Sequence, residues 1–235
     1  MQWATNWTCN FFKYLGVFFD SHLNFDKHFE HALSKVSYSI GCLMQIKRFV
    51  NLQTFKILVT SFVFSHIDYC LPIWGHQSDT HIKLLQSRLN ALLGAYFYPQ
   101  IVNKFQRFNK IAHKNDRWSF KQPKIDYPEL WERCNLLSVA ERLKYFSSII
   151  AFQAIRNPSI TKISSLFNSG NSQRSQNITI LNHDSSILER SAYYQAIKTW
   201  NSLNKEAKQV GIGLESFKVV VDAWLISKRN SEFVS

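Results

Sequence analysis

The sequence predicts a mainly α-helical protein: a helical bundle preceded by a short β-element and followed by C-terminal helices. Apolar residues recur at steps of three and four along most of the chain, which is typical of amphipathic helices. Only 7 Gly and 5 Pro occur in 235 residues, and a turn-rich all-β sandwich would need more of both. Hydrophobic residues make up 46% of the chain, which is too apolar for intrinsic disorder and sufficient for a core.

The first predicted element is a strand over residues 11–19. This segment is aromatic and β-branched with a single glycine, which indicates a strand buried on both faces. A helix is expected next, with Asn24 as its N-cap and Asp26 in the first turn, where the helix dipole favours an acid. Its apolar stripe is formed by Phe25, Phe29, Ala32 or Leu33, Val36, Ile40 and Leu43.

Two further helices complete a predicted bundle that extends to residue 98. The second helix begins near Asn51 and ends before Pro72, because proline disfavours a helical conformation in the residue before it. The third begins at an Asp79 cap and ends at Gly94. Short links favour antiparallel packing of these helices. The side chains expected to face inward are Phe55, Leu58, Val59, Phe62 and Val63 in the second helix and Ile82, Leu85, Leu89 and Leu92 in the third.

The clearest amphipathic pattern spans residues 101–121. Cations recur there every three or four residues and gather on one helix face, diluted only by Asp116. Such a face can contact the phosphates of a nucleic acid. A solvated helix face and binding to a membrane surface are the alternatives. The predicted nucleic-acid-binding residues are Lys104, Arg107, Lys110, Lys114, Arg117 and Lys121, together with Lys35, Lys47 and Arg48.

The rest of the chain is predicted as helices interrupted by one polar linker. Ser138 and Glu141 form a capping box, in which each side chain satisfies a free backbone amide of the other residue. Residues 168–177 contain no apolar side chain and indicate a linker, and helical patterns follow at 188–203 and 214–226. The predicted regions are a β-remnant (1–20), a bundle (21–98), the basic and capped helices (99–167), the linker (168–186) and the C-terminal helices (187–235).

The charge balance favours an anionic partner. Lys and Arg number 28 against 16 Asp and Glu, which gives a net charge of +12 and ranks nucleic acid ahead of a membrane surface or an acidic protein. No apolar run approaches the roughly 20 residues that span a bilayer. Residues 1–10 lack a signal-peptide pattern. We therefore expect no membrane partner and an intracellular location, in the cytoplasm or the nucleus.

No catalytic constellation is evident in the sequence. It contains no adjacent Asp pair that would hold two metal ions, no Gly-rich phosphate loop and no G-x-S-x-G motif. His28 and His31 could share a helix face near His22, but a third metal ligand is not evident. They are expected to be surface histidines, and no catalytic residue, metal ligand or cofactor is assigned to this chain.

Short motifs follow one another in a definite order along the chain. They are Lys13-Tyr14-Leu15-Gly16-Val17 with Asp20, Leu23 to Phe29, Ile67 to Gly75, Leu84 to Arg88, Leu137 to Arg142, and Ala196 to Leu203 with Ser216-Phe217-Lys218. In this order they resemble the end of the palm, the thumb and the C-terminal part of reverse transcriptases from non-LTR (LINE-type, jockey-like) retrotransposons. The resemblance covers residues 11–94, 136–157 and 188–226, and Asn204 stands where the family usually has proline.

The resemblance implies a thumb-like helical bundle that holds an RNA/DNA primer–template duplex through phosphate contacts. Lys13, Tyr14, Leu15, Gly16 and Val17 would then lie near the primer terminus. The family's catalytic palm, with its metal-binding Asp pair, would lie upstream of residue 1. We therefore expect a nucleic-acid-binding fragment that is inactive alone as an RNA-directed DNA polymerase, with Mg²⁺ needed only by the intact family enzyme. The alternative is a non-catalytic helical interaction or scaffold protein, or a decayed retroelement open reading frame.

Overall fold

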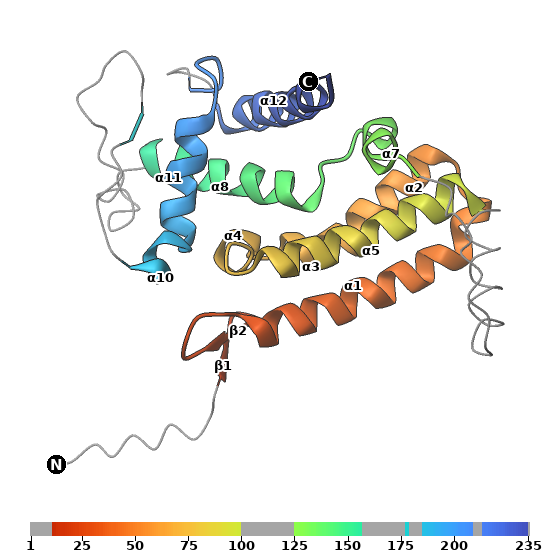
Figure 1. Ribbon diagram of the computed structural model, residues 1–235, viewed down its shortest axis with the longest axis horizontal. Coiled ribbons are helices and arrows are strands. Elements are labelled where there is room, and N and C mark those ends of the chain that lie inside the picture. The colour runs from red at the N-terminus through yellow and green to blue at the C-terminus, as the bar shows by residue number, and fades with distance from the viewer. Residues whose placement is uncertain (1–10, 100–124, 157–176, 179–184, 209–212, 235) are drawn as a thin grey trace.

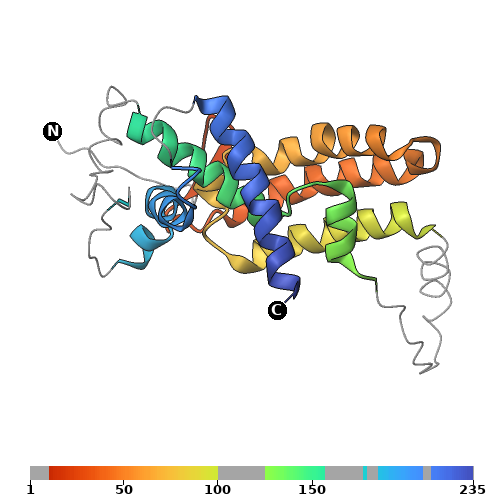
Figure 2. The ribbon, with the colours of Figure 1, turned by 90° about the horizontal axis from the view of Figure 1, so that it is seen from above.

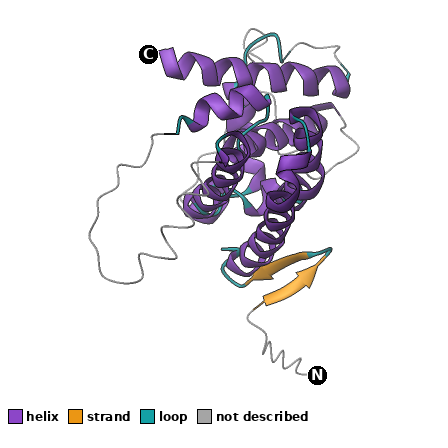
Figure 3. Ribbon diagram, turned by 90° about the vertical axis from the view of Figure 1, so that its right-hand side faces the viewer, coloured by secondary structure: helices purple, strands orange, loops and turns teal. Residues whose placement is uncertain are grey.

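The computed structural model describes residues 11–99, 125–156, 177–178, 185–208 and 213–234. This part of the chain is mainly helical, with one two-stranded antiparallel sheet near the N-terminus (Figures 1 and 3). The predicted fold class is therefore confirmed.

The β-element is a hairpin rather than the single strand predicted over residues 11–19. Strand β1 (Phe11–Tyr14) pairs antiparallel with β2 (Val17–Asp20). Leu15 (φ 44°) and Gly16 (φ 84°) form the turn between them, and two positive φ angles characterise the type I′ turn that suits a tight hairpin. Strand β1 is exposed throughout, so the expected burial on both faces is wrong. The single glycine of this aromatic run marks a reversal of the chain.

Helix α1 (Asp26–Ile46) begins one residue later than predicted, and its cap comes from the hairpin. Phe25 is the N-cap, with φ 59° and no capping hydrogen bond from its side chain. The Asp20 carboxylate instead accepts hydrogen bonds from the backbone N–H groups of Asn24 at 3.0 Å and Phe25 at 2.6 Å. The predicted apolar stripe is confirmed: Phe25, Phe29, Ala32, Val36 and Leu43 are buried, and Leu33 and Ile40 are partly buried.

Helix α2 (Leu52–Leu58) follows the short 3₁₀ helix η1 (Lys47–Phe49). Its predicted start is confirmed, because the Asn51 side chain accepts a hydrogen bond from the Thr54 N–H at 2.8 Å. The chain then continues without a break into a π-helical segment.

The π-helical segment η2 (Val59–Phe64) changes which side chains face the core. A π turn contains more residues than an α turn, so it rotates the inward face along the sequence. Phe62, which was expected inside, is 55% exposed, whereas Phe64 and Ile67 are buried. The helix ends as α3 (Ser65–Asp68), ahead of Pro72 as predicted.

Helix α5 (Asp79–Phe97) follows the short helix α4 (Leu71–Trp74). Its N-cap is Ser78 rather than Asp79, with the Ser78 hydroxyl accepting from the His81 N–H at 3.4 Å. Gly94 lies inside the helix and does not end it. A Cβ atom there would lie 3.5 Å from the side chains of Ile125 and Tyr127, which is an ordinary van der Waals contact.

Helix α7 (Tyr127–Cys134) was not predicted, because Pro128 suggested an interruption. The proline stands in the first turn, where a missing N–H costs nothing, and the Asp126 side chain caps the helix by accepting from the Glu129 N–H at 3.2 Å. Helix α8 (Val139–Arg156) follows and opens with the predicted capping box. The Ser138 N–H donates to the Glu141 carboxylate at 2.7 Å, and the Glu141 N–H donates to the Ser138 hydroxyl at 3.4 Å.

Two hydrophobic cores share helix α8. Val139 and Leu143, in its first half, join a core formed by α1 to α5 and α7. Ala151 and Phe152, in its second half, join a core formed with the C-terminal helices, and α12 packs across α8 (Figure 2). The C-terminal helices are α10 (Ser186–Glu189), α11 (Ala192–Ser202) and α12 (Leu214–Val234).

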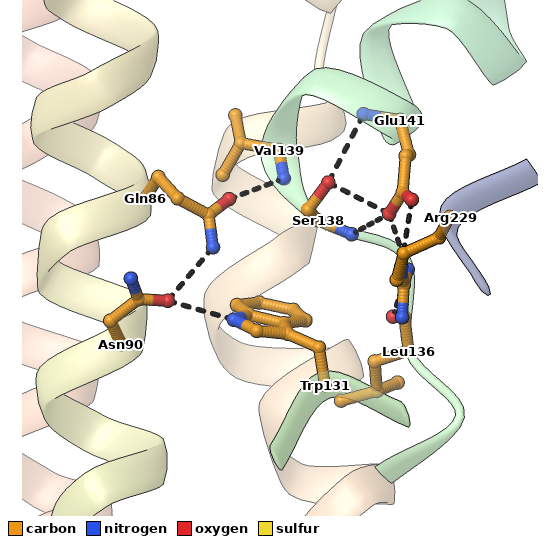
Figure 4. Close-up of polar contacts among 8 residues, drawn as sticks. All are labelled: Gln86, Asn90, Trp131, Leu136, Ser138, Val139, Glu141 and Arg229. Carbon is orange, nitrogen blue, oxygen red and sulfur yellow. Dashed lines mark hydrogen bonds and ion pairs between the residues drawn. The ribbon is translucent and has the colours of Figure 1, made fainter. Parts of the chain in front are cut away.

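Polar contacts tie α8 to α5 and to α12 (Figure 4). The Gln86 side chain of α5 accepts a hydrogen bond from the Val139 N–H at 2.9 Å. Arg229 of α12 donates from Nε to the Glu141 carboxylate at 2.8 Å and from Nη2 to the Leu136 carbonyl oxygen at 2.9 Å. The start of α8 is therefore held from two sides.

Candidate nucleic-acid interface

A pocket of about 310 Å³ lies between the hairpin, α1 and the end of α3. Figure 1 shows the hairpin at the N-terminal end of α1, with β2 leading into the helix. His28, His31 and Lys35 fall at helical spacing and so share one face of α1. The described lining residues are Lys13 and Gly16 of the hairpin, His28, His31, Ala32 and Lys35 of α1, and Ser65, His66 and Tyr69 at α3.

The hairpin wall of the pocket is attached to α3 through Tyr69. The Tyr69 hydroxyl donates a short hydrogen bond to the Leu15 carbonyl oxygen in the turn. A Cβ atom at Gly16 would lie 3.4 Å from the Tyr69 ring, an ordinary van der Waals contact, and it is the φ of 84° that disfavours other residues there. On the strand itself, the Lys13 Nζ lies 5.3 Å from the centroid of the Phe18 ring, a cation–π distance. The turn and its lysine are thus held against the helices.

Positive charge dominates the pocket. Two lysines and three histidines line it, and none of its described lining residues is acidic. A recess lined by charges of one sign attracts ligands of the opposite sign. The pocket is therefore suited to an anion.

The histidines of the pocket are neutral at pH 7. Burial, reinforced by the charges of His31 and Lys35, lowers the pKa of His28 to about 4. Burial also lowers the pKa of His31, with further contributions from Lys35, Lys13, His66 and Lys27. For His66, burial and Lys35 lower the pKa. The lysines therefore carry the positive charge at neutral pH.

His28 is the least ordinary member of the pocket. It is only 4% exposed, and its ring lies 5.5 Å from the Trp74 ring. Neither of its ring nitrogens has a hydrogen-bond partner within the described part of the chain. Leaving buried polar atoms unsatisfied costs about 1–3 kcal/mol. The expectation of a surface histidine is wrong here. The signal was present in the sequence, because position 28 lies one helical turn before Ala32 of the apolar stripe.

The structure brings together residues that the sequence assigned by separate arguments. Lys13 and Gly16, from the motif near the predicted primer terminus, line the same pocket as Lys35. Tyr14 and Leu15 are exposed beside it. Val17, the last residue of that motif, is buried in the first core.

The other predicted basic residues do not join this pocket. Lys47 and Arg48 belong to η1 at the far end of α1, about 18 Å from Lys35 at the helical rise of 1.5 Å per residue. Burial and the neighbouring Arg48 lower the pKa of Lys47. The six cations of the predicted basic helix lie outside the described residues: Lys104, Arg107, Lys110, Lys114, Arg117 and Lys121.

Sequence reasoning missed the contribution of α3 to the site. Ser65, His66 and Tyr69 were treated as the end of a core helix, and only the packing of α3 beside α1 brings them to Lys35. Within the described ranges, no group of three or more His, Cys, Asp or Glu side chains is arranged to hold a metal ion.

Comparisons with known proteins give no family for the chain. No family model, curated protein or solved structure matches it. Among the helices of the described residues, none has both the length and the apolar character needed to cross a membrane. The function must therefore be argued from the site itself.

Proposed function

We propose that the chain binds the phosphate backbone of a nucleic-acid duplex, in the manner of the thumb and C-terminal part of a non-LTR retrotransposon reverse transcriptase. The observation that carries this proposal is the convergence of Lys13 and Lys35 on one pocket whose described lining contains no acid. Lysines that meet phosphates release condensed counterions, and this release provides most of the affinity of sequence-independent binding. The net charge of +12 extends the attraction beyond the pocket.

Contacts among the family-like motifs support the same proposal. Arg142 donates to the Asp68 carboxylate at 2.7 Å, although the two residues come from motifs far apart in the sequence. The Trp74 indole N–H donates to the Tyr69 carbonyl oxygen at 2.9 Å, and Tyr69 in turn holds the hairpin. These contacts are what the proposal expects if the motifs belong to one thumb-like unit.

The first test is the salt dependence of duplex binding. Each phosphate neutralised on B-DNA adds about 0.9 to the slope of log affinity against log salt concentration. The double variant Lys13→Gln/Lys35→Gln should therefore lower the slope by about 1–2 and weaken binding to all sequences alike. The matched control is Lys83→Gln/Lys144→Gln, which removes two exposed lysines outside the pocket and should leave the slope unchanged.

The predicted basic helix is tested in the same assay. Changing Lys110, Lys114 and Arg117 to Gln should lower the slope by about 2–3, because three phosphate contacts would be lost. Equal slopes for wild type and the pocket variant would remove the pocket from the interface. Duplex binding that does not depend on salt in any variant would contradict the proposal as a whole.

A second candidate function is a helical interaction protein, and exposed apolar side chains favour it. Tyr38 is 77% exposed on α1 and Phe49 is 80% exposed on η1, and Ile57 and Phe62 are exposed on the adjoining α2 and η2. Exposed apolar residues of this kind can form an interface with a partner protein. A Tyr38→Ser/Phe49→Ser variant would then lose its partner and keep its affinity for duplex.

A further inference from the structure

Binding to the phosphate backbone of a duplex through lysines does not require the histidines of the pocket. His28, His31 and His66 converge on the pocket from α1 and α3. His28 is buried, and its two ring nitrogens find no partner among the described residues and are closed off from the pocket. The groups that a ligand in the pocket can reach are therefore His31 and His66, together with Lys13 and Lys35.

We propose that this pocket binds a phosphate monoester group and that its histidines take up protons as the ligand binds. The volume of about 310 Å³ lies at the lower end of the range for small-ligand pockets. A monoester at the end of a chain or on a small molecule can enter such a recess. An internal phosphodiester is flanked by nucleosides on both sides, which keep it at the surface. This inference refines the proposed function, because it concerns the same pocket. It rests on the proposed function in one respect, namely that the phosphate belongs to the end of a nucleic acid.

Charge explains why a monoester is favoured over a diester. The groups facing the histidines are Lys13 from β1, Lys27 and Lys35 from α1, and the Tyr69 hydroxyl beyond α3, while Phe18 and Trp74 pack on the rings as uncharged neighbours. Lys27 is partly balanced by Glu30 at 3.5 Å. The surplus of positive charge opposes protonation of the histidines. It also favours a ligand that carries a second negative charge.

Binding should therefore consume protons. A dianion beside Lys13 and Lys35 reverses the local field, so the pKa values of His31 and His66 rise when the ligand binds. A group with a higher pKa in the complex than in the free protein makes binding tighter as pH falls. The ligand remains mostly dianionic down to about pH 6.5, because the second pKa of a phosphate monoester is about 6. The window for the effect is thus pH 8.0 to 6.5.

The experiment compares two duplexes that differ only in a terminal phosphate. The full chain is titrated with a DNA duplex carrying 5′-phosphates and with the same duplex carrying 5′-hydroxyls, at constant ionic strength, at pH 6.5 and pH 8.0. The phosphorylated duplex should bind about tenfold tighter at pH 6.5, since charge-assisted hydrogen bonds are gained, and the preference should shrink at pH 8.0. Calorimetry in buffers of different ionisation enthalpy should report proton uptake.

Two variants assign the effect to the pocket. His66→Gln should reduce the preference for the 5′-phosphate and its pH dependence, whereas the control His22→Gln, an exposed histidine outside the pocket, should not.

The outcomes separate this inference from the proposed function. Equal affinity for the two duplexes at both pH values overturns the inference, and a salt-dependent affinity would still support duplex binding. Adenosine 5′-monophosphate and inorganic phosphate provide the second arm. Binding of either, with proton uptake and no duplex binding, would support the pocket, identify a free phosphate as the source and contradict the proposed function.

Discussion

Asp20 illustrates how one carboxylate organises the junction between the hairpin and α1. It accepts hydrogen bonds from the backbone N–H groups of His22, Asn24 and Phe25. Burial acts to raise the pKa of Asp20, but these N–H donors outweigh it and the pKa is lowered. Leu23 and Phe25 adopt positive φ in the same turn. Asn24 looked like the natural cap because of its residue type, yet the cap came from a neighbouring element.

Trp74 is the residue whose truncation should cost most at this scale. It is 1% exposed, shares the first core with Leu85 and Leu89, and its indole N–H is bonded to the Tyr69 carbonyl oxygen. Trp74→Ala should lower the free energy of unfolding by about 3–5 kcal/mol, as for other buried aromatic truncations. Urea denaturation followed by circular dichroism measures the change, so the loss of a fluorophore does not affect the readout. An unchanged midpoint would contradict the assigned core.

At the scale of elements, the helices were predictable because their signals are local. The stripe of α1, the Asn51 cap and the Ser138–Glu141 capping box are all written within a few residues of where they act. The π-helical segment was not predictable, since residues 57–64 are apolar on nearly every side and hide the shift of the inward face. The pocket could not be assembled either. Lys13, Lys35 and His66 meet only through the packing of the hairpin, α1 and α3.

The docking of α12 on α8 should depend on one ion pair. Arg229 and Glu141 have side chains that are 8% and 14% exposed. Arg229→Met should cost about 3 kcal/mol, because it leaves a charged carboxylate without its cation in a buried site. The double variant Arg229→Met/Glu141→Gln should recover much of that loss, since the stranded charge is also removed. Thermal and urea denaturation of the wild type, Arg229→Met, Glu141→Gln and the double variant complete the cycle.

The same pair should also give a defined pH response. Burial raises the pKa of Glu141, but the hydrogen bonds from Arg229 and Ser138 prevail and hold it below its ordinary value of 4.5. The stability it contributes is therefore present above about pH 4.5 and is lost as pH falls through the lower value of the folded state. Wild type and the double variant should converge in stability below that pH. A constant difference down to pH 3 would contradict this assignment.

At the scale of the whole molecule, α8 makes the two cores one cooperative unit. Its first half belongs to the core of α1 to α5 and α7, and its second half belongs to the core of α11 and α12. Unfolding of either core would expose apolar side chains of α8, and α8 also forms part of the other core. The molecule should therefore lose stability as a unit.

Hydrogen exchange should reveal this coupling. Leu85→Ala in the first core and Phe217→Ala in the second each remove a fully buried side chain. Each variant should speed amide exchange in both cores by similar factors, because global unfolding limits the slowest amides. Exchange accelerated only in the C-terminal helices of Phe217→Ala, with the bundle unaffected, would show two independent units. Surface variants at Lys83 and Lys144 provide the control.

Helix α1 also fixes the distance between two basic positions, the pocket and the pair Lys47 and Arg48. It contains 21 residues, which corresponds to about 31 Å at 1.5 Å per residue. The pocket lies beside its first half, and Lys47 and Arg48 follow directly after its last turn. One turn of B-form DNA rises about 34 Å, so the roughly 18 Å between Lys35 of the pocket and Lys47 corresponds to about half a turn of a duplex lying parallel to α1. The two basic positions are therefore spaced at about half a helical repeat, and a single rigid element sets that distance.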